Sequence, residues 1–263
     1  MAHKTIKIIQ NESLVRIAFN RSKVLNALSE TMIAETTDIF QNLSENKSVR
    51  VIVLEGIGKA FSAGADLAYM KNAGESDLAQ NVQHGQNLEK MYKALEDCSK
   101  PIIAKAHGFA IGGGFGFLAL ADIVIAEKNT KFALSEVKLG IIPAVIGPYC
   151  VKKIGLSHFK ALGITGELID TERALRIGLI HEIAEADILE KSVMKKVNQL
   201  LSAGPNAIAT FKEYCKNIDM DKGAALIAQL RASDEGQEGL AAFLEKRKPD
   251  WVETVVRQIE TVE

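Results

Sequence analysis

The sequence predicts an α/β protein with a largely helical C-terminal part. Three short runs rich in β-branched residues, 49–54, 102–106 and 123–126, have the composition of buried strands. The segments between them are long enough to hold the crossover helices that parallel strands require. The second half of the chain is predicted to be almost wholly helical, with glycines and prolines between the helices. A chain of 263 residues is long enough to bury one substantial core.

The N-terminal elements follow from hydrophobic spacing. Residues 5–9 and 13–19 are predicted to be two strands, because apolar residues alternate along the second of them. A helix is expected next, since Ile33 and Phe40 recur at helical spacing after Ser29, which is a suitable N-cap.

The sequence also predicts a second long helix and a boundary between two parts of the chain. Residues 77–98 carry apolar residues at helical spacing and a polar face, which predicts a long helix. The composition shifts near residues 200–205. We therefore expect a catalytic core at residues 1–200 and a C-terminal helical subdomain at residues 201–263.

Composition and charge exclude several classes of protein. With 32 Lys and Arg against 33 Asp and Glu, the net charge of -1 gives no basic field that would attract nucleic acid. The three cysteines are odd in number and far apart, which favours a reducing compartment. The N-terminus lacks the apolar segment of a secretory signal, and the most apolar window, 109–121, is too short to span a bilayer. We expect a cytoplasmic protein that binds neither nucleic acid nor membrane.

Two glycine-rich stretches carry most of the functional information. Phe-Ser-Ala-Gly-Ala-Asp at 61–66 follows the run at 49–54, and Ile-Gly-Gly-Gly-Phe-Gly at 111–116 opens an apolar helix at 117–121. Small residues let backbone N–H groups approach a ligand, and a helix N-terminus adds the positive end of its dipole. Two N–H groups from separate loops would make an oxyanion hole, which stabilises negative charge on a carbonyl oxygen. These stretches favour an enzyme that forms an enolate.

Glycine-rich stretches also occur in nucleotide-binding loops and in plain turns. The second stretch does not fit the dinucleotide motif Gly-x-Gly-x-x-Gly, because Phe117 occupies the last glycine position, and no Gly-Lys-Ser/Thr follows it. A plain strand-to-helix turn remains an alternative. Ser62 lacks the Gly-x-Ser-x-Gly setting of a nucleophile, and Asp66 and Asp122 are interpreted as caps or buried acceptors.

Glu136 is the candidate acid–base residue. A carboxylate lodged among Leu134, Val137, Leu139 and Ile141 would lose hydration, and its pKa would rise towards neutrality. The alternative is a surface residue paired with Lys138. The five histidines and three cysteines show no metal-ligand spacing, so no metal site is expected.

Four segments taken together, 58–67, 108–122, 132–143 and 238–249, resemble the crotonase superfamily, the enoyl-CoA hydratase/isomerase group. The resemblance implies a core of stacked ββα spiral turns with a C-terminal helical part. It also implies an acyl-CoA thioester substrate and assembly into homotrimers or dimers of trimers. No cofactor is implied, since coenzyme A is part of the substrate.

The same resemblance assigns roles to individual residues. The N–H groups of Ala65 and Gly113 would form the oxyanion hole, and Glu136 would act as acid and base. The residues implied to contact the substrate or its CoA group are Lys23, Ala63, Asp66, Leu67, Gly112, Gly116, Pro143, Phe243 and Lys246, the last two often from a neighbouring subunit.

Gly116 departs from the usual hydratase pattern. Typical hydratases carry a glutamate here and a second one at the position of Glu136. The stretch 134–146 is closest to bacterial methylglutaconyl-CoA hydratase-like proteins, in which glycine also stands at this position. We expect a hydratase of a short or branched 2-enoyl-CoA, with methylglutaconyl-CoA as the narrower candidate. An enoyl-CoA isomerase with a single glutamate base and a low-activity acyl-CoA-binding scaffold remain as alternatives.

Overall fold

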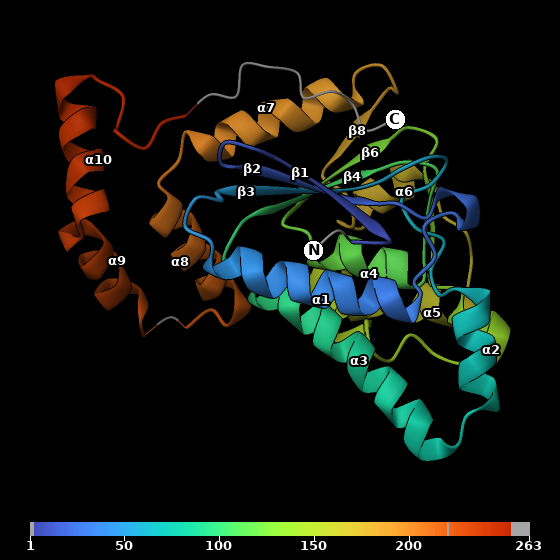
Figure 1. Cartoon of the computed structure of the whole chain (residues 1–263). Helices are drawn as coiled ribbons and strands as arrows, with labels where there is room; N and C mark the ends of the chain where they lie inside the picture. Colours follow the sequence, from blue (N-terminus) through green and yellow to red (C-terminus); the bar gives the residue numbers. More distant parts are fainter. Residues whose placement is uncertain (1–2, 220, 254–263) are drawn as a thin grey trace.

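The computed structural model describes residues 3–219 and 221–253 (Figure 1). Within these residues, a six-stranded sheet in the order β1-β2-β3-β4-β6-β8 forms the centre of the fold. β1 and β2 pair antiparallel, and the other neighbours pair in parallel, as the crossover spacing predicts. The strands are β1 (Ile6–Asn11), β2 (Leu14–Phe19), β3 (Val51–Gly56), β4 (Ile102–Ala106), β6 (Ile123–Glu127) and β8 (Glu182–Ala184).

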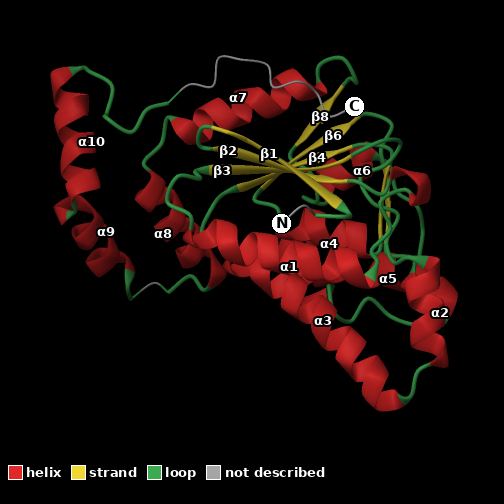
Figure 2. Cartoon of the chain, in the orientation of Figure 1, coloured by secondary structure: helices red, strands yellow, loops and turns green. Residues whose placement is uncertain are grey.

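Helices cover both faces of this sheet, which explains why the inner strands β2, β3, β4 and β6 are mostly apolar and buried (Figure 2). On one face, Val53 of β3 packs with Val193 of α7. On the other face, Leu54 packs in the cluster that contains Phe40 and Phe117. The covering helices are α7 (Leu189–Leu201) on the first face and α1 (Glu30–Glu45), α3 (Leu78–Asp97) and α4 (Gly113–Leu120) on the second.

The two predicted N-terminal helices are confirmed, with their caps. Ser29 accepts a hydrogen bond from the Met32 N–H at 3.3 Å, and α1 buries Ile33 and Phe40. α3 begins with a capping box in which Asp77 and Gln80 exchange side-chain-to-backbone hydrogen bonds.

A smaller parallel pair, β5 (Phe109–Ile111) and β7 (Lys131–Ala133), lies beside the main sheet and leads into the site. β7 and β8 fall in the half of the chain that was expected to be almost wholly helical, and that expectation is wrong there. Each of these strands has only three residues. Such short strands cannot display an alternating pattern in the sequence.

Further helices surround the site and form the C-terminal part. In Figure 1, α9 and α10 project away from the sheet, on the opposite side of the molecule from α2. The division of the chain at residue 200 stays a prediction. None of the described helices is long and apolar enough to cross a membrane. These helices are α2 (Leu67–Glu75), α5 (Gly147–Thr165), α6 (Thr171–Arg176), α8 (Pro205–Lys216), α9 (Gly223–Ala232) and α10 (Asp234–Glu245).

Candidate active site

The two glycine-rich stretches lie side by side, joined by backbone hydrogen bonds. Ser62 N–H donates to the Phe109 carbonyl and Ile111 N–H donates to the Ser62 carbonyl, both at 3.0 Å. Gly64 has a φ of +91°, and a Cβ built on it would lie 2.9 Å from the Ile111 carbonyl oxygen. A side chain at this position would therefore push the two loops apart.

The start of α4 packs closely against its surroundings. Gly112, the N-cap, has a φ of +51°, and its N–H donates to the Ala133 carbonyl at 2.9 Å. A Cβ on Gly113 would lie 2.4 Å from Leu28 Cδ1. Because Gly113 is the first helical residue, its N–H has no acceptor within the helix.

Ala65 supplies a second N–H group without an acceptor. Leu28 N–H donates to the Gly64 carbonyl at 2.7 Å, and Asp66 N–H donates to the Leu28 carbonyl at 3.0 Å. Leu28 is therefore hydrogen-bonded to the residues on either side of Ala65, in the pattern of a parallel bridge. The N–H of Ala65 itself points away from Leu28. In the loop hydrogen bonds of the described residues, neither Ala65 nor Gly113 is a donor.

Both of these residues line a single cavity of about 180 Å³. The cavity lies between the start of α4, one side of α3 and the segment that follows residues 136–139, a short 3₁₀ turn named η2. Its walls are mostly apolar. The lining residues are Leu28, Ala65, Tyr69, Leu88, Tyr92, Gly113, Glu136, Ile141, Ile142, Pro143, Ala144, Val145 and Ile146.

Glu136 brings a carboxylate into this cavity from the first position of η2. A Cβ on Gly112 would lie 3.2 Å from Glu136 Oε1, so the carboxylate rests against the N-cap of α4. Oε2 is buried and has no hydrogen-bond partner among the described residues. Burial raises the pKa of Glu136, because the charged form loses hydration.

The predicted surroundings of Glu136 are only partly right. Leu134 is buried, but Val137 and Ile141 are 38% and 54% exposed, so they do not enclose the carboxylate. Gly112 at the N-cap of α4 also lies close to the carboxylate. No ion pair between Glu136 and Lys138 occurs among the described residues, which removes the surface-pair alternative.

Neighbouring side chains fill the space at Gly116. A Cβ here would lie 2.5 Å from Ile146 Cγ2 and 3.2 Å from Tyr92 Cε1. A glutamate would therefore displace both side chains. Among the described residues that line the cavity, Glu136 is accordingly the one carboxylate.

Three predicted contact residues gather on the loop side of the cavity. Lys23 is exposed on η1 (Ser22–Val24), the 3₁₀ turn whose C-cap is Leu25. Ala63 N–H donates to the Leu25 carbonyl at 2.9 Å, which holds that turn against the first glycine loop. Leu67 is 80% exposed at the start of α2. Pro143 is buried in the cavity wall.

Asp66 has a structural role in this chain. Its carboxylate caps α2 by accepting from Ala68 N–H at 2.8 Å and forms an ion pair with Arg21 Nη2 at 2.8 Å. Burial alone would raise the pKa of Asp66, but the hydrogen bonds from Arg21 and from the helix lower it overall. The interpretation of Asp66 as a cap is confirmed, and contact with CoA stays a prediction.

Phe243 and Lys246 are not brought to the cavity by their own chain. Phe243 is 81% exposed on α10, and Lys246 is the left-handed C-cap of that helix with a φ of 56°. α10 lies on the far side of the molecule from α2 (Figure 1). A contact with CoA from these residues requires a second copy of the chain.

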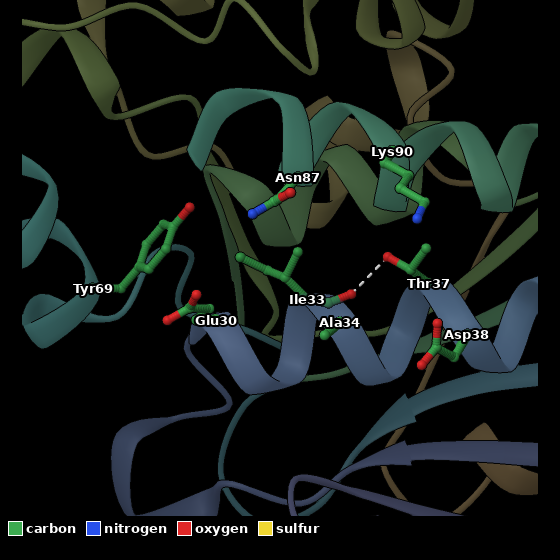
Figure 3. Close-up of a pocket in the computed structure, with 8 residues that line it drawn as sticks. All are labelled: Glu30, Ile33, Ala34, Thr37, Asp38, Tyr69, Asn87 and Lys90. Atoms are coloured by element: carbon green, nitrogen blue, oxygen red, sulfur yellow. Dashed lines mark hydrogen bonds between the residues drawn. The ribbon is translucent and has the colours of Figure 1, made fainter. Parts of the chain in front are cut away.

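A second cavity, also of about 180 Å³, lies between α1 and α3 (Figure 3). It is polar: Glu30 and Asp38 project from α1, and Lys90 and Asn87 project from α3. Tyr69 lines both cavities. No sequence motif indicates this second cavity.

The described residues offer no evident metal centre. Within residues 3–219 and 221–253, no group of three or more His, Cys, Asp or Glu side chains could hold a metal ion. The prediction that the site uses no cofactor is not tested by this finding.

Comparisons with known proteins match this geometry to one family. The sequence model of the family described as enoyl-CoA hydratase/isomerase matches residues 9–254. A crotonyl-CoA hydratase of Syntrophomonas wolfei is 32% identical, over 96% of this chain and 99% of that protein. A short-chain-enoyl-CoA hydratase of Clostridium acetobutylicum is 32% identical, over 92% and 95%. The crystal structure of an enoyl-CoA hydratase from Shewanella pealeana superposes with a TM-score of 0.90 at 34% identity, covering 95% of this chain and 96% of that one.

Proposed function

The chain belongs to the enoyl-CoA hydratase/isomerase family, and we propose that it adds water to the double bond of a short or branched 2-enoyl-CoA. One observation carries this proposal. Glu136 Oε2 and the N–H groups of Ala65 and Gly113, which have no hydrogen-bond partner within residues 3–219 and 221–253, belong to residues that line one apolar cavity. The relatives named for crotonyl-CoA and short-chain enoyl-CoA hydration support a short acyl group.

In the proposed reaction, the thioester oxygen accepts hydrogen bonds from the N–H groups of Ala65 and Gly113. Water oxygen forms a bond to the β-carbon, and the π electrons of the double bond move into the thioester as an enolate. Glu136 takes the proton that the water releases and returns it to the α-carbon, so one water molecule is added in total. Each N–H donor of such a hole typically contributes about 2.7–4 kcal/mol of transition-state stabilisation.

The raised pKa of Glu136 suits this cycle. A carboxylate that is desolvated accepts a proton more readily than an exposed one, and it still releases that proton to a carbanion. The apolar walls keep other water molecules away from the enolate.

The CoA group is proposed to extend from the cavity past Ala63, Leu67 and Lys23. Its adenine and phosphates would meet Phe243 and Lys246 of a neighbouring copy, because α10 projects away from its own cavity. A homotrimer or a dimer of trimers is thus part of the proposal, and the molar mass in solution tests it. A cytoplasmic location is proposed with it.

An isomerase is the second candidate, and Gly116 favours it. With Ile146 and Tyr92 filling the space of a second carboxylate, a single glutamate is left to shuttle a proton between the α- and γ-carbons. Such a reaction needs no water.

Turnover of 2-enoyl-CoA and 3-enoyl-CoA thioesters in ¹⁸O-labelled water tests the two candidates. The panel includes crotonyl-CoA and methylglutaconyl-CoA. We expect label at the β-carbon of the product, and the relative rates identify the acyl group. An isomerised product without label would establish the isomerase. CoA binding without any turnover would establish an acyl-CoA-binding scaffold.

A further inference from the structure

Tyr92 places a hydroxyl group at the oxyanion-hole end of the cavity. Its Oη donates to the Gly113 carbonyl at 2.9 Å. A Cβ on Gly113 would lie 2.9 Å from this Oη, while a Cβ on Gly112 would lie 3.2 Å from Glu136 Oε1. The phenol and the carboxylate therefore rest against consecutive glycines of one turn, and both residues line the same cavity.

The hydrogen-bonding capacity of the two groups is complementary. The single proton of the Tyr92 hydroxyl is used on Gly113, so its oxygen is left as an acceptor. Burial, with Cys150 and Glu136 nearby, raises the pKa of Tyr92 well above its usual value, and the phenol stays protonated. Glu136 Oε2 has no partner among the described residues. Each of these two cavity-lining residues therefore keeps one acceptor atom, Tyr92 Oη and Glu136 Oε2, and one water molecule has two hydrogens to donate.

We propose that Tyr92 is a water-positioning residue, whose Oη accepts one hydrogen of the reacting water while Glu136 Oε2 accepts the other. The inference rests on the proposed hydratase function. It assigns to Tyr92 the water contact that a second glutamate would supply, at the place where the ring of Tyr92 and Ile146 fill the space beside Gly116. The water then keeps a lone pair for the β-carbon, Glu136 takes one proton, and the Tyr92 hydroxyl neither gains nor loses one.

Two rates measured on one preparation test this role. Hydration of crotonyl-CoA needs the positioned water, whereas exchange of the α-protons of butyryl-CoA with D₂O needs only the oxyanion hole and Glu136. We expect Tyr92→Phe to lower kcat for hydration about 10-fold, as expected for the loss of one hydrogen bond, with KM unchanged. The exchange rate should stay near that of the wild type. A preparation that is partly unfolded lowers both rates by the same factor, so their ratio still reports on the water.

Tyr149→Phe is the matched control. Its ring lies 6.2 Å from that of Tyr92, but Tyr149 does not line the cavity, and both rates should be unchanged. An equal fall of both rates in Tyr92→Phe would mean that Tyr92 only supports the Gly113 peptide or the fold, and would overturn the inference. Hydration at the wild-type rate would overturn it as well, with the proposed function intact. A wild-type enzyme that exchanges α-protons but hydrates no enoyl-CoA would overturn both.

Discussion

Two cavities of similar volume meet at Tyr69, and they differ in how far their polar groups are satisfied. In the cavity between α1 and α3, the carboxylates of Glu30 and Asp38 belong to exposed residues that water can reach (Figure 3). The hydroxyl of Thr37 is satisfied, since it donates to the Ile33 carbonyl at 2.8 Å. The walls of this cavity are side chains of α1 and α3, together with Tyr69 of α2.

The cavity at the glycine loops has fewer polar groups, and three of them lack partners among the described residues. Glu136 Oε2 is buried and unpaired among the described residues, and the N–H groups of Ala65 and Gly113 have no acceptor there. Leaving buried polar groups unsatisfied costs stability, so proteins rarely do so without a function. The difference between the two cavities therefore indicates that unsatisfied groups, rather than volume or charge, identify the site.

The largest expected effect comes from replacing one carboxylate of each cavity with its amide, in two separate variants. Glu136→Gln should lower kcat for hydration by roughly 10²–10⁴-fold, because the amide cannot take the proton of the water. Asp38→Asn makes the same chemical change in the polar cavity and should leave kcat at the wild-type value. Turnover of crotonyl-CoA and the dissociation constant for a saturated acyl-CoA are the measurements. Equal losses in the two variants would contradict the distinction between the cavities.

The next effect concerns the backbone of the oxyanion hole. Gly113→Ala adds a Cβ that would lie 2.4 Å from Leu28 Cδ1 and 2.9 Å from Tyr92 Oη, so either these side chains or the backbone of residue 113 must shift. We expect kcat to fall by about 10²-fold, as for the loss of an oxyanion donor. Gly85→Ala in α3 is the control, because nothing lies within 4 Å of its Cβ. It should retain activity and raise the free energy of unfolding by about 0.5–1 kcal/mol. Full activity of Gly113→Ala would show that the added methyl group does not displace this N–H group.

How much of this could be predicted from the sequence depends on how locally each feature is encoded. The strands β1, β2, β3, β4 and β6 and the helices α1 and α3 follow from spacing and caps, and family membership follows from ordered motifs, so these predictions are confirmed. The narrower likeness to methylglutaconyl-CoA hydratases stays a prediction. The surroundings of Glu136 were predicted from its sequence neighbours alone, whereas in the structure Gly112, which is distant in sequence, also lies against its carboxylate. The contact of Tyr92 with Gly113 likewise joins α3 to α4 through the fold, and no local pattern encodes it.

A smaller effect is expected at the wall that the two cavities share. Tyr69→Ala removes the ring between them and should lengthen the apolar cavity towards α1. Since one methylene group in an apolar pocket is worth about 1–3 kcal/mol, the ratio of kcat/KM for 2-hexenoyl-CoA over crotonyl-CoA should rise roughly 10-fold. Tyr69→Phe keeps the ring and should keep the wild-type ratio. An unchanged ratio in Tyr69→Ala would show that the acyl chain does not extend towards Tyr69.

The smallest expected effect is on the pH dependence of activity and stability, which should depend on Glu136 and not on Asp38 of the polar cavity. Because burial raises the pKa of Glu136, the acid limb of kcat for hydration should lie above the pH expected of an exposed glutamate, about 4.3, with half of the activity lost where pH equals the raised pKa. Asp38→Asn should leave this limb in place. Stability should change in the opposite direction from activity. The folded state holds the Glu136 proton more tightly than the unfolded chain, so the contribution of Glu136 to stability falls as pH rises from about 4.3 through the raised pKa. Glu136→Gln should therefore be more stable than the wild type above that window and equal to it below. Thermal unfolding from acid to neutral pH measures this difference, and curves that coincide throughout would refute a desolvated carboxylate.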